Sequence, residues 1–448
     1  MNDTKKTDEE RLRKAYEPAR LAMKYHPFYG GKIETTPKCP IRDFQDFAIW
    51  YTPGVAEPCR DIQKNPEQVY NHTNKWNTVA IVTDGTRVLG LGDIGPEAGL
   101  PVMEGKALLF KYLGGVDAVP ICLNTKDPNE IIQAVKWLTP SFGGINLEDI
   151  SHPKCFTILD KLRKEVEIPV WHDDQQGTAT IVTAGAINAL KVVGKNMNEA
   201  LVAMIGAGAA NIAIARVLIA AGVDVRNIVM VDSKGILHSG RTDLKEKYPE
   251  KWDMALRSNR DGKTGGIKEA MKGADIVIAA SRPGPDVITK DMVKGMADDS
   301  IVFATANPIP EIWPWDAKEA GARIVATGRS DFPNQINNSL GFPGIFRGAL
   351  DVRAKTITDE MCIAAALEIA NTAEDKGLTE DCIVPTMDEW EVFPREALAV
   401  GMKAMQQGVA RIKVSRKELY ETAESMIRRA RGMTQLLMKK GCIKPPPE

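Results

Sequence analysis

The sequence predicts an α/β fold with mostly parallel sheets. Apolar runs of strand length alternate with helical patterns through most of the chain. The Gly-rich turn GAGAAN, at 206–211, follows one of these runs and opens a helix, which is typical of a Rossmann-type doubly wound domain. At 448 residues the chain is too long for a single core. We therefore expect a smaller N-terminal α/β domain over 1–160, the Rossmann-type domain over 161–390 and a C-terminal helical segment over 391–448.

The N-terminal third has the pattern of a small parallel sheet. Its first 20 residues are charged from the start, which predicts an amphipathic helix and not a signal peptide. Beyond them, short apolar runs predict strands, and apolar residues at helical spacing predict helices. The expected strands are 78–84, 117–123, 143–149 and 166–170, and the expected helices are 105–115, 129–138 and 155–166.

The middle of the chain repeats the strand and helix pattern more regularly, and its end is helical. A helix over 211–222 follows the Gly-rich turn and ends at a glycine. After Gly341 two long helices are expected, over 359–377 and 415–441. Strands that lead into loops are expected at 200–208, 227–235, 274–281, 300–308 and 322–330.

Composition excludes several classes of function. The net charge of −1 leaves no basic surface for nucleic acid or an anionic membrane. No apolar run approaches the ~18 residues of a membrane span. The seven cysteines have no C-x-x-C spacing, so neither a disulfide framework nor a zinc knuckle is expected. A reducing, cytoplasmic setting is the simplest interpretation.

The Gly-rich turn predicts a dinucleotide site. Gly206 and Gly208 permit a tight turn and a close approach of the backbone to a pyrophosphate at the helix N-terminus. The third glycine of the usual pattern is replaced by Asn211, which would make the turn slightly wider. The alternative is a tight strand-to-helix turn without a ligand.

The end of the next strand bears on the choice of cofactor. Asp232 lies 24 residues beyond Gly208, where a carboxylate could accept hydrogen bonds from the adenine ribose and would repel a phosphate. Ser233 and Lys234 follow directly and could bind that phosphate. We expect NAD, with NADP as the alternative.

Two pairs of acids lie at strand ends. Glu148 and Asp149 follow one expected strand, and Asp173 and Asp174, in WHDDQQGTA, follow its presumed neighbour. Four carboxylates in one cleft would repel one another strongly unless a cation lay among them. Oxygen ligands without a histidine or cysteine cluster indicate Mg²⁺ or Mn²⁺ rather than zinc. Taken singly, each pair could equally be solvated loop charge.

Two further residues are candidates for proton transfer. Glycines between 90 and 105 predict a loop that places Lys106 at the start of a helix. The positive end of the helix and burial would both lower the pKa of Lys106, which suits a general base. Tyr51 precedes the stiff corner TPG and could act as a general acid. A surface lysine and a buried aromatic residue are the alternatives. Amides in loops after strands, at Asn307, Asn337 and Asn338, suit recognition of a carboxylate or carboxamide, or form Asx turns.

In their order along the chain these motifs resemble the malic enzymes in their short prokaryotic-type form. The matching segments are YTPGVA, RVLGLGDIGP, GLPVMEGK, NLEDI, HDDQQGTA, GAGAAN, VDSKG, TANP and NNSLGFPG, from about residue 46 to 348. The resemblance implies oxidative decarboxylation of malate to pyruvate and carbon dioxide, dependent on a divalent metal and a nicotinamide cofactor. Since the chain ends without the long extension of some bacterial members, we expect no regulation through such a domain.

The resemblance also implies a role for each matched residue. Tyr51 would be the general acid, Lys106 the general base and Asp173 the acid that hydrogen-bonds that lysine. The metal ligands would be Glu148, Asp149 and Asp174. Arg87 would grip a substrate carboxylate, and Asn307 and Asn338 would contact the other end of malate. The cofactor contacts would come from Thr178, Gly206, Gly208, Ala209, Ala210, Asn211, Asp232, Asn307 and Asn337.

Three other functions fit part of the pattern. A malolactic-type enzyme would use a similar site without net redox change. A plain 2-hydroxy-acid dehydrogenase needs no metal and leaves the acid pairs unexplained. A non-catalytic nucleotide-binding regulator has no use for Lys106 and Tyr51. For a soluble enzyme of this size a homodimer or a higher homo-oligomer is the expected assembly.

Overall fold

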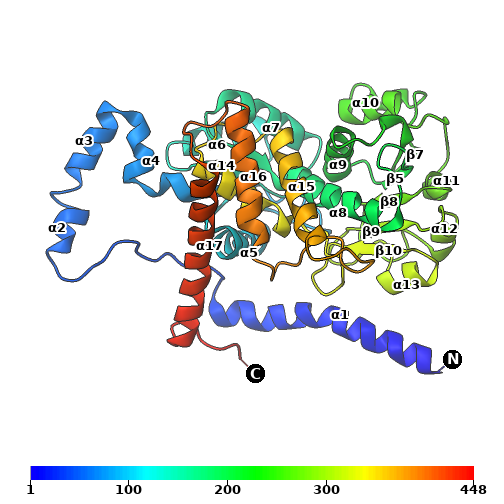
Figure 1. The fold of residues 1–448 in the computed structure, drawn as a ribbon, viewed down its shortest axis with the longest axis horizontal. Coiled ribbons are helices and arrows are strands. Elements are labelled where there is room, and N and C mark those ends of the chain that lie inside the picture. The colour runs from blue at the N-terminus through cyan, green and yellow to red at the C-terminus, as the bar shows by residue number, and fades with distance from the viewer. Residues whose placement is uncertain (1, 448) are drawn as a thin grey trace.

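Two sheets organise the described part of the chain, residues 2–447 of this computed structural model (Figure 1). The first is a four-stranded parallel sheet with the order β2-β1-β3-β4. Its strands are β1 (Thr78–Thr83), β2 (Asp117–Cys122), β3 (Gly144–Leu147) and β4 (Val170–His172). Every described residue of β3 and β4 is buried, as expected for a parallel sheet covered on both faces.

The second sheet has six strands in the order β10-β9-β8-β5-β6-β7. All its pairings are parallel except that of the short edge strand β7 with β6. The strands are β5 (Val202–Ile205), β6 (Ile228–Asp232), β7 (Gly235–Ile236), β8 (Ile276–Ala279), β9 (Ile301–Ala304) and β10 (Ile324–Thr327). The chain starts at β5 in the middle and runs first to one side and then to the other, which confirms the Rossmann-type α/β prediction.

Helices cover the sheets. The N-terminal ones are α1 (Asn2–Tyr29), α2 (Asp46–Trp50), α3 (Ala56–Lys64), α4 (Val69–His72), α5 (Pro96–Gly114), α6 (Pro128–Leu138) and α7 (Lys154–Glu165). The second sheet is accompanied by α8 (Thr178–Val193), α9 (Ala209–Ala220), α10 (Pro249–Arg257), α11 (Ile267–Met271), α12 (Lys290–Lys294) and α13 (Pro314–Glu319). The last four are α14 (Phe342–Asp351), α15 (Asp359–Glu374), α16 (Val392–Gln406) and α17 (Arg416–Lys439).

The C-terminal helices pack back onto the N-terminal sheet. One core cluster joins β1 and α5 to α14, α16 and α17, and within it the rings of Phe110 and Phe342 lie 4.6 Å apart. β4 pairs with β3, so the first sheet runs to His172, past the predicted boundary at residue 160. The covering helices begin at Phe342, before the predicted start at residue 391. Pairing and packing between distant segments set these limits, and a local pattern does not show such contacts.

Helix α5 begins nine residues earlier than the sequence predicted. Gly95, with φ +85°, ends the preceding loop, and Pro96 occupies the first helical turn, where a missing N–H has no cost. The glycines at 99 and 105 are therefore helical. Lys106 lies in the middle of the helix and not at its start, so the helix dipole does not act on it.

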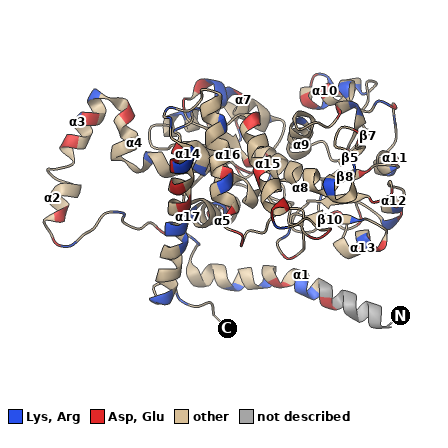
Figure 2. Cartoon of the chain, in the orientation of Figure 1, with Lys and Arg blue, Asp and Glu red and all other residues tan. Residues whose placement is uncertain are grey.

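One segment stands apart from the rest. Residues 39–64, which we call the arm, contain α2 and α3 and project to the left in Figure 1. Exposed large apolar side chains gather on it: Ile41, Phe44, Phe47, Ile49, Trp50, Tyr51 and Val55. Elsewhere charges of both signs are interspersed along the ribbon, as Figure 2 shows. Among the described helices none has the length and apolar character needed to cross a membrane.

Candidate active site

Neighbouring strands bring the two acid pairs together, as predicted. β3 and β4 are paired in parallel with Leu147 opposite His172, so the residues that follow them leave the sheet at the same edge. Glu148 and Asp149 follow β3 directly. Asp173 and Asp174 open a single π-helical turn, η3 (Asp173–Gly177), a form that is rare and often found at functional sites.

Three of these acids form a cluster suited to a cation. Oxygen atoms of Glu148, Asp149 and Asp174 all lie within 4.8 Å of one another. Ligands on opposite sides of a Mg²⁺ ion are about 4 Å apart, since each bond is about 2.0–2.1 Å. The Asp149 N–H donates to Asp174 Oδ2 at 2.9 Å, whereas Asp149 Oδ2 is buried without a hydrogen-bond partner in the described chain. The possible ligands are all oxygen atoms, and one of them lacks a hydrogen-bond partner, which fits a site for Mg²⁺ or Mn²⁺.

The carboxyl groups of the cluster are held in an unfavourable environment. Burial raises the pKa of Glu148 and of Asp149 well above the ordinary values, and the charges of the neighbouring acids raise both further. Lys106 offsets only part of this effect. Perturbation of this kind is concentrated at functional sites.

Lys106 lies beside the cluster and is almost fully buried. Its Nζ forms a short ion pair with Asp173 and a second one, of 3.0 Å, with Glu148. The other Asp173 oxygen accepts from Trp171 Nε1 at 2.9 Å, and the ring of Phe342 lies 4.4 Å from Nζ. Asp173 thus holds the lysine, as the resemblance implied.

The expected lowering of the Lys106 pKa is wrong for the structure as it stands. Burial does act in that direction. The charges of Asp173 and Glu148, with the hydrogen bond to Asp173, outweigh it and raise the pKa of Lys106. The sequence showed the glycines and the helix around this lysine, but not which acids would face it.

The loop after β1 is pressed against both the cluster and the second sheet. The Arg87 N–H donates to the Asp149 carbonyl oxygen at 2.9 Å. A Cβ added to Gly90 would lie 2.5 Å from the Asn307 carbonyl oxygen, so this approach requires glycine. On the opposite side, Asn338 Cβ lies 3.1 Å from where a Gly177 Cβ would be, against the π-helical turn. The Arg87 backbone and Asn338 thus lie next to the segments that carry the acids, and Asn307 lies against the loop after β1.

The Gly-rich turn is tighter than its sequence suggested. Gly206 has φ +99°, and a Cβ there would lie 2.6 Å from the Ala280 carbonyl oxygen. Asn211 is fully buried, and its amide donates to the carbonyl oxygens of Ile205 at 2.9 Å and Gly206 at 2.8 Å. These two hydrogen bonds close the turn, so the widening expected from Asn211 is not observed. Gly208, Ala209 and Ala210 lead into α9, and Thr178 begins α8.

Two predicted cofactor contacts have partners within the protein. The Asn337 amide donates to Gly328 O at 2.9 Å, and its oxygen accepts from the Ser339 N–H at 3.0 Å, which is the Asx-turn alternative. The Asp232 carboxylate is held by both terminal nitrogens of Arg241 at 3.0 Å.

Tyr51 is not brought to the site within this chain. It follows α2 on the arm and is 71% exposed. Its exposure also contradicts the alternative of a buried aromatic residue. The arm projects away from α5, on which Lys106 lies (Figure 1).

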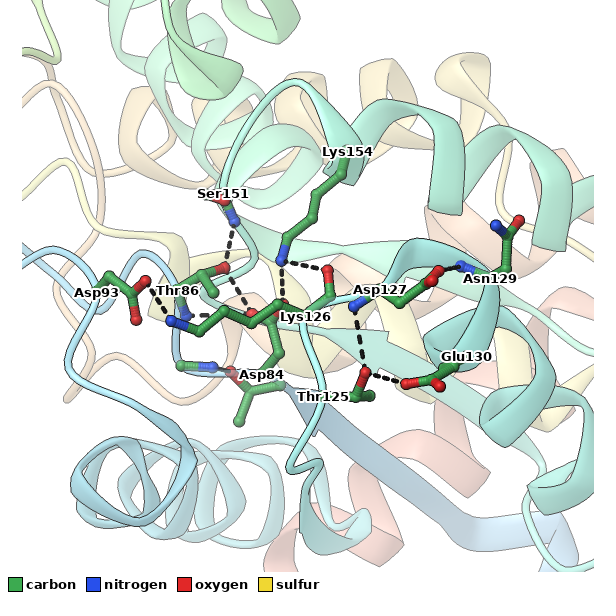
Figure 3. Close-up of polar contacts among 12 residues, drawn as sticks. Asp84, Thr86, Asp93, Thr125, Lys126, Asp127, Asn129, Glu130, Ser151 and Lys154 are labelled. Atoms are coloured by element: carbon green, nitrogen blue, oxygen red, sulfur yellow. Dashed lines mark hydrogen bonds and ion pairs between the residues drawn. The ribbon is translucent and has the colours of Figure 1, made fainter.

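Sequence reasoning missed a buried ion pair at the end of β1, which Figure 3 shows. Asp84, fully buried after β1, forms a short ion pair with Lys154 and accepts from Thr86 Oγ1 at 2.6 Å. Thr86 Oγ1 in turn accepts from the Ser151 N–H at 3.0 Å. These contacts fasten the loop that follows Asp149 to the end of β1. The sequence did contain a signal for this pair, because Asp84 follows the end of an expected strand, as the two acid pairs do.

Comparison with known proteins agrees with this geometry. Residues 30–163 match the family "Malic enzyme, N-terminal domain", and residues 175–405 match "Malic enzyme, NAD binding domain". The chain is 52% identical to the bifunctional malic/malolactic enzyme of Bacillus subtilis, over 90% of this chain and 97% of that protein. It is also 52% identical to the NAD-dependent malic enzyme of Geobacillus stearothermophilus, over 85% of this chain and 78% of that protein.

A solved structure extends the likeness to three dimensions. The crystal structure of the Entamoeba histolytica malic enzyme is 48% identical and superposes with a TM-score of 0.97, over 98% of this chain and 92% of that one. The two family matches together span most of the residues, in the same order as the two sheets. The chain belongs to the malic enzyme family.

Proposed function

We propose that the chain catalyses the oxidative decarboxylation of malate to pyruvate and carbon dioxide, with reduction of NAD or NADP and with Mg²⁺ or Mn²⁺. The observation that carries this proposal is the buried carboxylate cluster in contact with Lys106, at the strand ends that face the Gly-rich turn. A plain dehydrogenase has no use for that cluster. The family membership and the names of the relatives support the same reaction.

The residues have distinct tasks in this reaction. Lys106 would take the proton of the C2 hydroxyl in its neutral form, which requires that the acids that raise its pKa be offset, and Asp173 would hold the resulting ammonium. Arg87 binds one substrate carboxylate, while Asn307 and Asn338 orient the other end. A nicotinamide dinucleotide at the Gly-rich turn would supply the hydride acceptor, and a cation held by Glu148, Asp149 and Asp174 would supply positive charge that offsets these carboxylates. Loss of carbon dioxide leaves an enolate, and Tyr51 returns a proton to C3.

In this structure Tyr51 is exposed on the arm, away from the Lys106 of its own chain. The arm that carries it is rich in exposed apolar side chains, which an isolated chain rarely leaves uncovered. We infer that the arm of one copy docks on a second copy and delivers its tyrosine beside the Lys106 of that partner. A symmetric dimer would then hold two sites, each made by both chains.

The cysteines bear on the cellular compartment of the protein. All seven lie in the described part of the chain and are unpaired. We infer a reducing compartment, the cytoplasm, where thiols of this kind stay free. Neither nucleic acid nor a membrane is proposed as a partner.

The test is the appearance of reduced nicotinamide with malate, for NAD and for NADP, each with Mn²⁺ or a chelator. We expect turnover with Mn²⁺ and its loss with chelator. Lys106→Ala should lower kcat by about 10²–10⁴-fold while nucleotide binding persists. Lys111→Ala, on the same helix but paired with Asp117 away from the cluster, is the matched control. No reduction of either cofactor in the presence of malate and Mn²⁺ would overturn the proposal.

A malolactic activity is the second candidate, because one relative at 52% identity is named a malic/malolactic enzyme. It would convert malate to lactate without net reduction of the nicotinamide. Measuring lactate, carbon dioxide and reduced cofactor together separates the two activities. A plain dehydrogenase would release no carbon dioxide, and a nucleotide-binding regulator would show no turnover.

A further inference from the structure

Glu311 is a fully buried acid that has no role in the proposed reaction. It lies in the loop that follows β9. Its Oε1 accepts from the Ser281 N–H at 2.8 Å and from Ser281 Oγ at 3.1 Å. Its Oε2 accepts from the Ala306 N–H at 3.0 Å. Both oxygens are therefore used, and their donors belong to two different loops.

These two loops leave neighbouring strands of the second sheet. β8 and β9 are paired in parallel, so Ser281 and Ala306 follow them at the same edge. The carbonyl oxygen of Glu311 also accepts from the Ile288 N–H at 3.0 Å. Glu311 thus holds the loop after β8 at both of its ends, and it ties the start of that loop to the loop after β9.

Both loops border the expected dinucleotide crevice. In a doubly wound sheet, ligands bind where the strand order reverses, which here is between β5 and β8. Ser281 Cα lies 3.3 Å from where a Gly206 Cβ would be, so the loop after β8 lies against the Gly-rich turn. The loop after β9 continues into Asn307, whose carbonyl oxygen lies 2.5 Å from where a Gly90 Cβ would be. The Glu311 side chain therefore fastens two loops that contact the rest of the site.

The ionisation of Glu311 decides how many donors it can hold. As a carboxylate it accepts on both oxygens, whereas the neutral acid carries a proton on one of them, which would face a donor hydrogen. Burial raises the pKa of Glu311 to about 7, although the hydrogen bonds from Ser281 and Ala306 act in the opposite direction. Charged side chains of the neighbouring segments are paired with one another: Arg282 with Asp286, Arg329 with Asp331, and Lys290 with Asp316 and Glu319. Glu311 belongs to none of these pairs, so burial and hydrogen bonds set its state.

We propose that Glu311 is a positioning residue of the active site, which in its ionised form holds the loops after β8 and β9 in place for the cofactor and for Asn307. This inference rests on the proposed function for the identity of the ligand. Protonation of Glu311 releases at least one of its donors, and the loop that carries this donor loses its place at the crevice. The affinity for the cofactor therefore falls as the pH falls through the pKa of Glu311.

The test is the affinity for NADH and for NADPH, measured by calorimetry on the full chain without malate or metal. Since the pKa of Glu311 is about 7, about nine tenths of this group are ionised at about pH 8 and about a tenth at about pH 6. An affinity that needs the ionised form is reduced by that fraction. We expect the cofactor that binds more tightly to lose about tenfold in affinity between about pH 8 and pH 6.

Glu311→Gln has the same shape and does not titrate. Its NH₂ group faces one of the donors, so at about pH 8 it should bind the cofactor about tenfold more weakly than the original chain, with little further loss at about pH 6. Comparison with this variant also removes any titration of the cofactor itself. Glu319→Gln, which changes an exposed acid of α13, is the control and should keep the original profile.

Ser281→Ala is a second and milder variant. It removes the hydroxyl donor and keeps the backbone donor. Because hydrogen bonds to a carboxylate favour its ionised form, the midpoint of the pH profile should move upward, by up to about one pH unit. A loop that Glu311 holds only structurally would show no such movement.

Several outcomes overturn the inference. A flat profile in the original chain would do so, as would a profile that persists in Glu311→Gln or a midpoint that does not move in Ser281→Ala. If neither NADH nor NADPH binds at any pH, the dinucleotide site fails, and the proposed function fails with it. A pH-dependent affinity without any turnover of malate would leave this inference standing and remove only the proposed reaction.

Discussion

Asp149 is the residue that most clearly requires a cation. One of its oxygens is buried without a hydrogen-bond partner, and the other is only 3.4 Å from the Leu89 N–H. We expect Asp149→Asn to weaken Mn²⁺ binding by at least about tenfold, because an amide oxygen carries no charge to offset that of the ion. Electron paramagnetic resonance of free Mn²⁺ measures the affinity directly. Mn²⁺ should raise the Tm of the original chain by more than that of the variant at the same concentration.

An exposed acid of the neighbouring loop is the control. Asp93 is half exposed and pairs with Lys126. Asp93→Asn should bind Mn²⁺ as the original chain does. Equal affinity in the original chain and in Asp149→Asn would mean that the cation lies elsewhere.

The buried carboxyl group of Glu396 should make the stability of the protein depend on pH. Its carboxyl group is fully buried against Gly344, without a hydrogen-bond partner for either oxygen in the described chain. Burial raises its pKa well above the ordinary value, with a further contribution from Glu368. Above about pH 5 the unfolded chain releases this proton while the folded chain keeps it. The free energy of unfolding should therefore fall by ~1.4 kcal/mol per pH unit until the raised pKa is reached.

Glu396→Gln removes that titration. Urea unfolding between about pH 5 and 8 should show a flatter dependence in this variant than in the original chain. Glu421→Gln, on the exposed side of α17, should keep the original slope. If Glu396→Gln keeps it too, the carboxyl group is not buried in its neutral form.

At the scale of residues, the sequence predicted that the two acid pairs lie together, but not the state of the groups around them. The two acid pairs were expected from their places at strand ends, and they do meet. The pKa of Lys106 was not predictable, because it depends on Asp173, which lies 67 residues away in the chain. The role of Asp232 depends likewise on Arg241, a residue in a loop with no pattern of its own. Local sequence contains neither contact.

At the scale of elements, the loop between β3 and α7 is held by the pair of Asp84 and Lys154. We expect Lys154→Met to cost ~3–5 kcal/mol of unfolding free energy, because Asp84 would remain buried without its cation. Mn²⁺ binding should weaken as well, since the same loop carries Asp149. Urea unfolding and Mn²⁺ titration measure the two effects.

A second lysine in Figure 3 gives a matched comparison. Lys126 pairs with Asp93 at the surface, where both side chains are about half exposed or more. Lys126→Met should therefore cost less than ~1 kcal/mol. Similar costs for Lys126→Met and Lys154→Met would mean that the buried pair contributes little to the loop.

The strands were predictable because a buried parallel strand is a short apolar run. Each of the nine expected ranges contains or overlaps one of the strands β1–β6 and β8–β10, and the two-residue edge strand β7 had no expected strand of its own. The start of α5 was missed because its glycines and prolines are typical of a loop, whereas Pro96 is tolerated in the first helical turn and Pro101 lies inside the helix. The domain boundary at residue 160 stays a prediction, although β4, which lies beyond it, pairs with β3 of the first sheet.

At the scale of the whole molecule, the arm is the part that a single chain leaves unexplained. Phe44 is 87% exposed and Tyr51 is 71% exposed, although the chain buries large apolar residues elsewhere. The sequence singled out Tyr51 but could not show that it lies away from Lys106, because a motif does not specify which copy of a chain it serves. A second copy would cover the apolar side chains and complete the site with one contact.

Complementation between two inactive variants tests this assembly. If each site takes Lys106 from one chain and Tyr51 from the other, Lys106→Ala and Tyr51→Phe should each lower activity by about 10²–10⁴-fold. A mixed dimer of the two has one site with both defects and one site with both native residues. Co-expression should therefore restore up to about a quarter of the original activity, because about half of the dimers are mixed and half of their sites are intact.

The controls separate assembly from chemistry. Phe44→Asp on the arm should reduce the dimer fraction in sedimentation and lower activity, while leaving the affinity for adenosine 5′-monophosphate unchanged, because the nucleotide site lies within one chain. Adding Tyr51→Phe to the chain that already carries Lys106→Ala should abolish complementation with a Tyr51→Phe partner, since no site then has both native groups. Activity that stays at the level of the separate variants after co-expression would place Tyr51 and Lys106 of a working site on the same chain, and the arm would have to fold back to reach it.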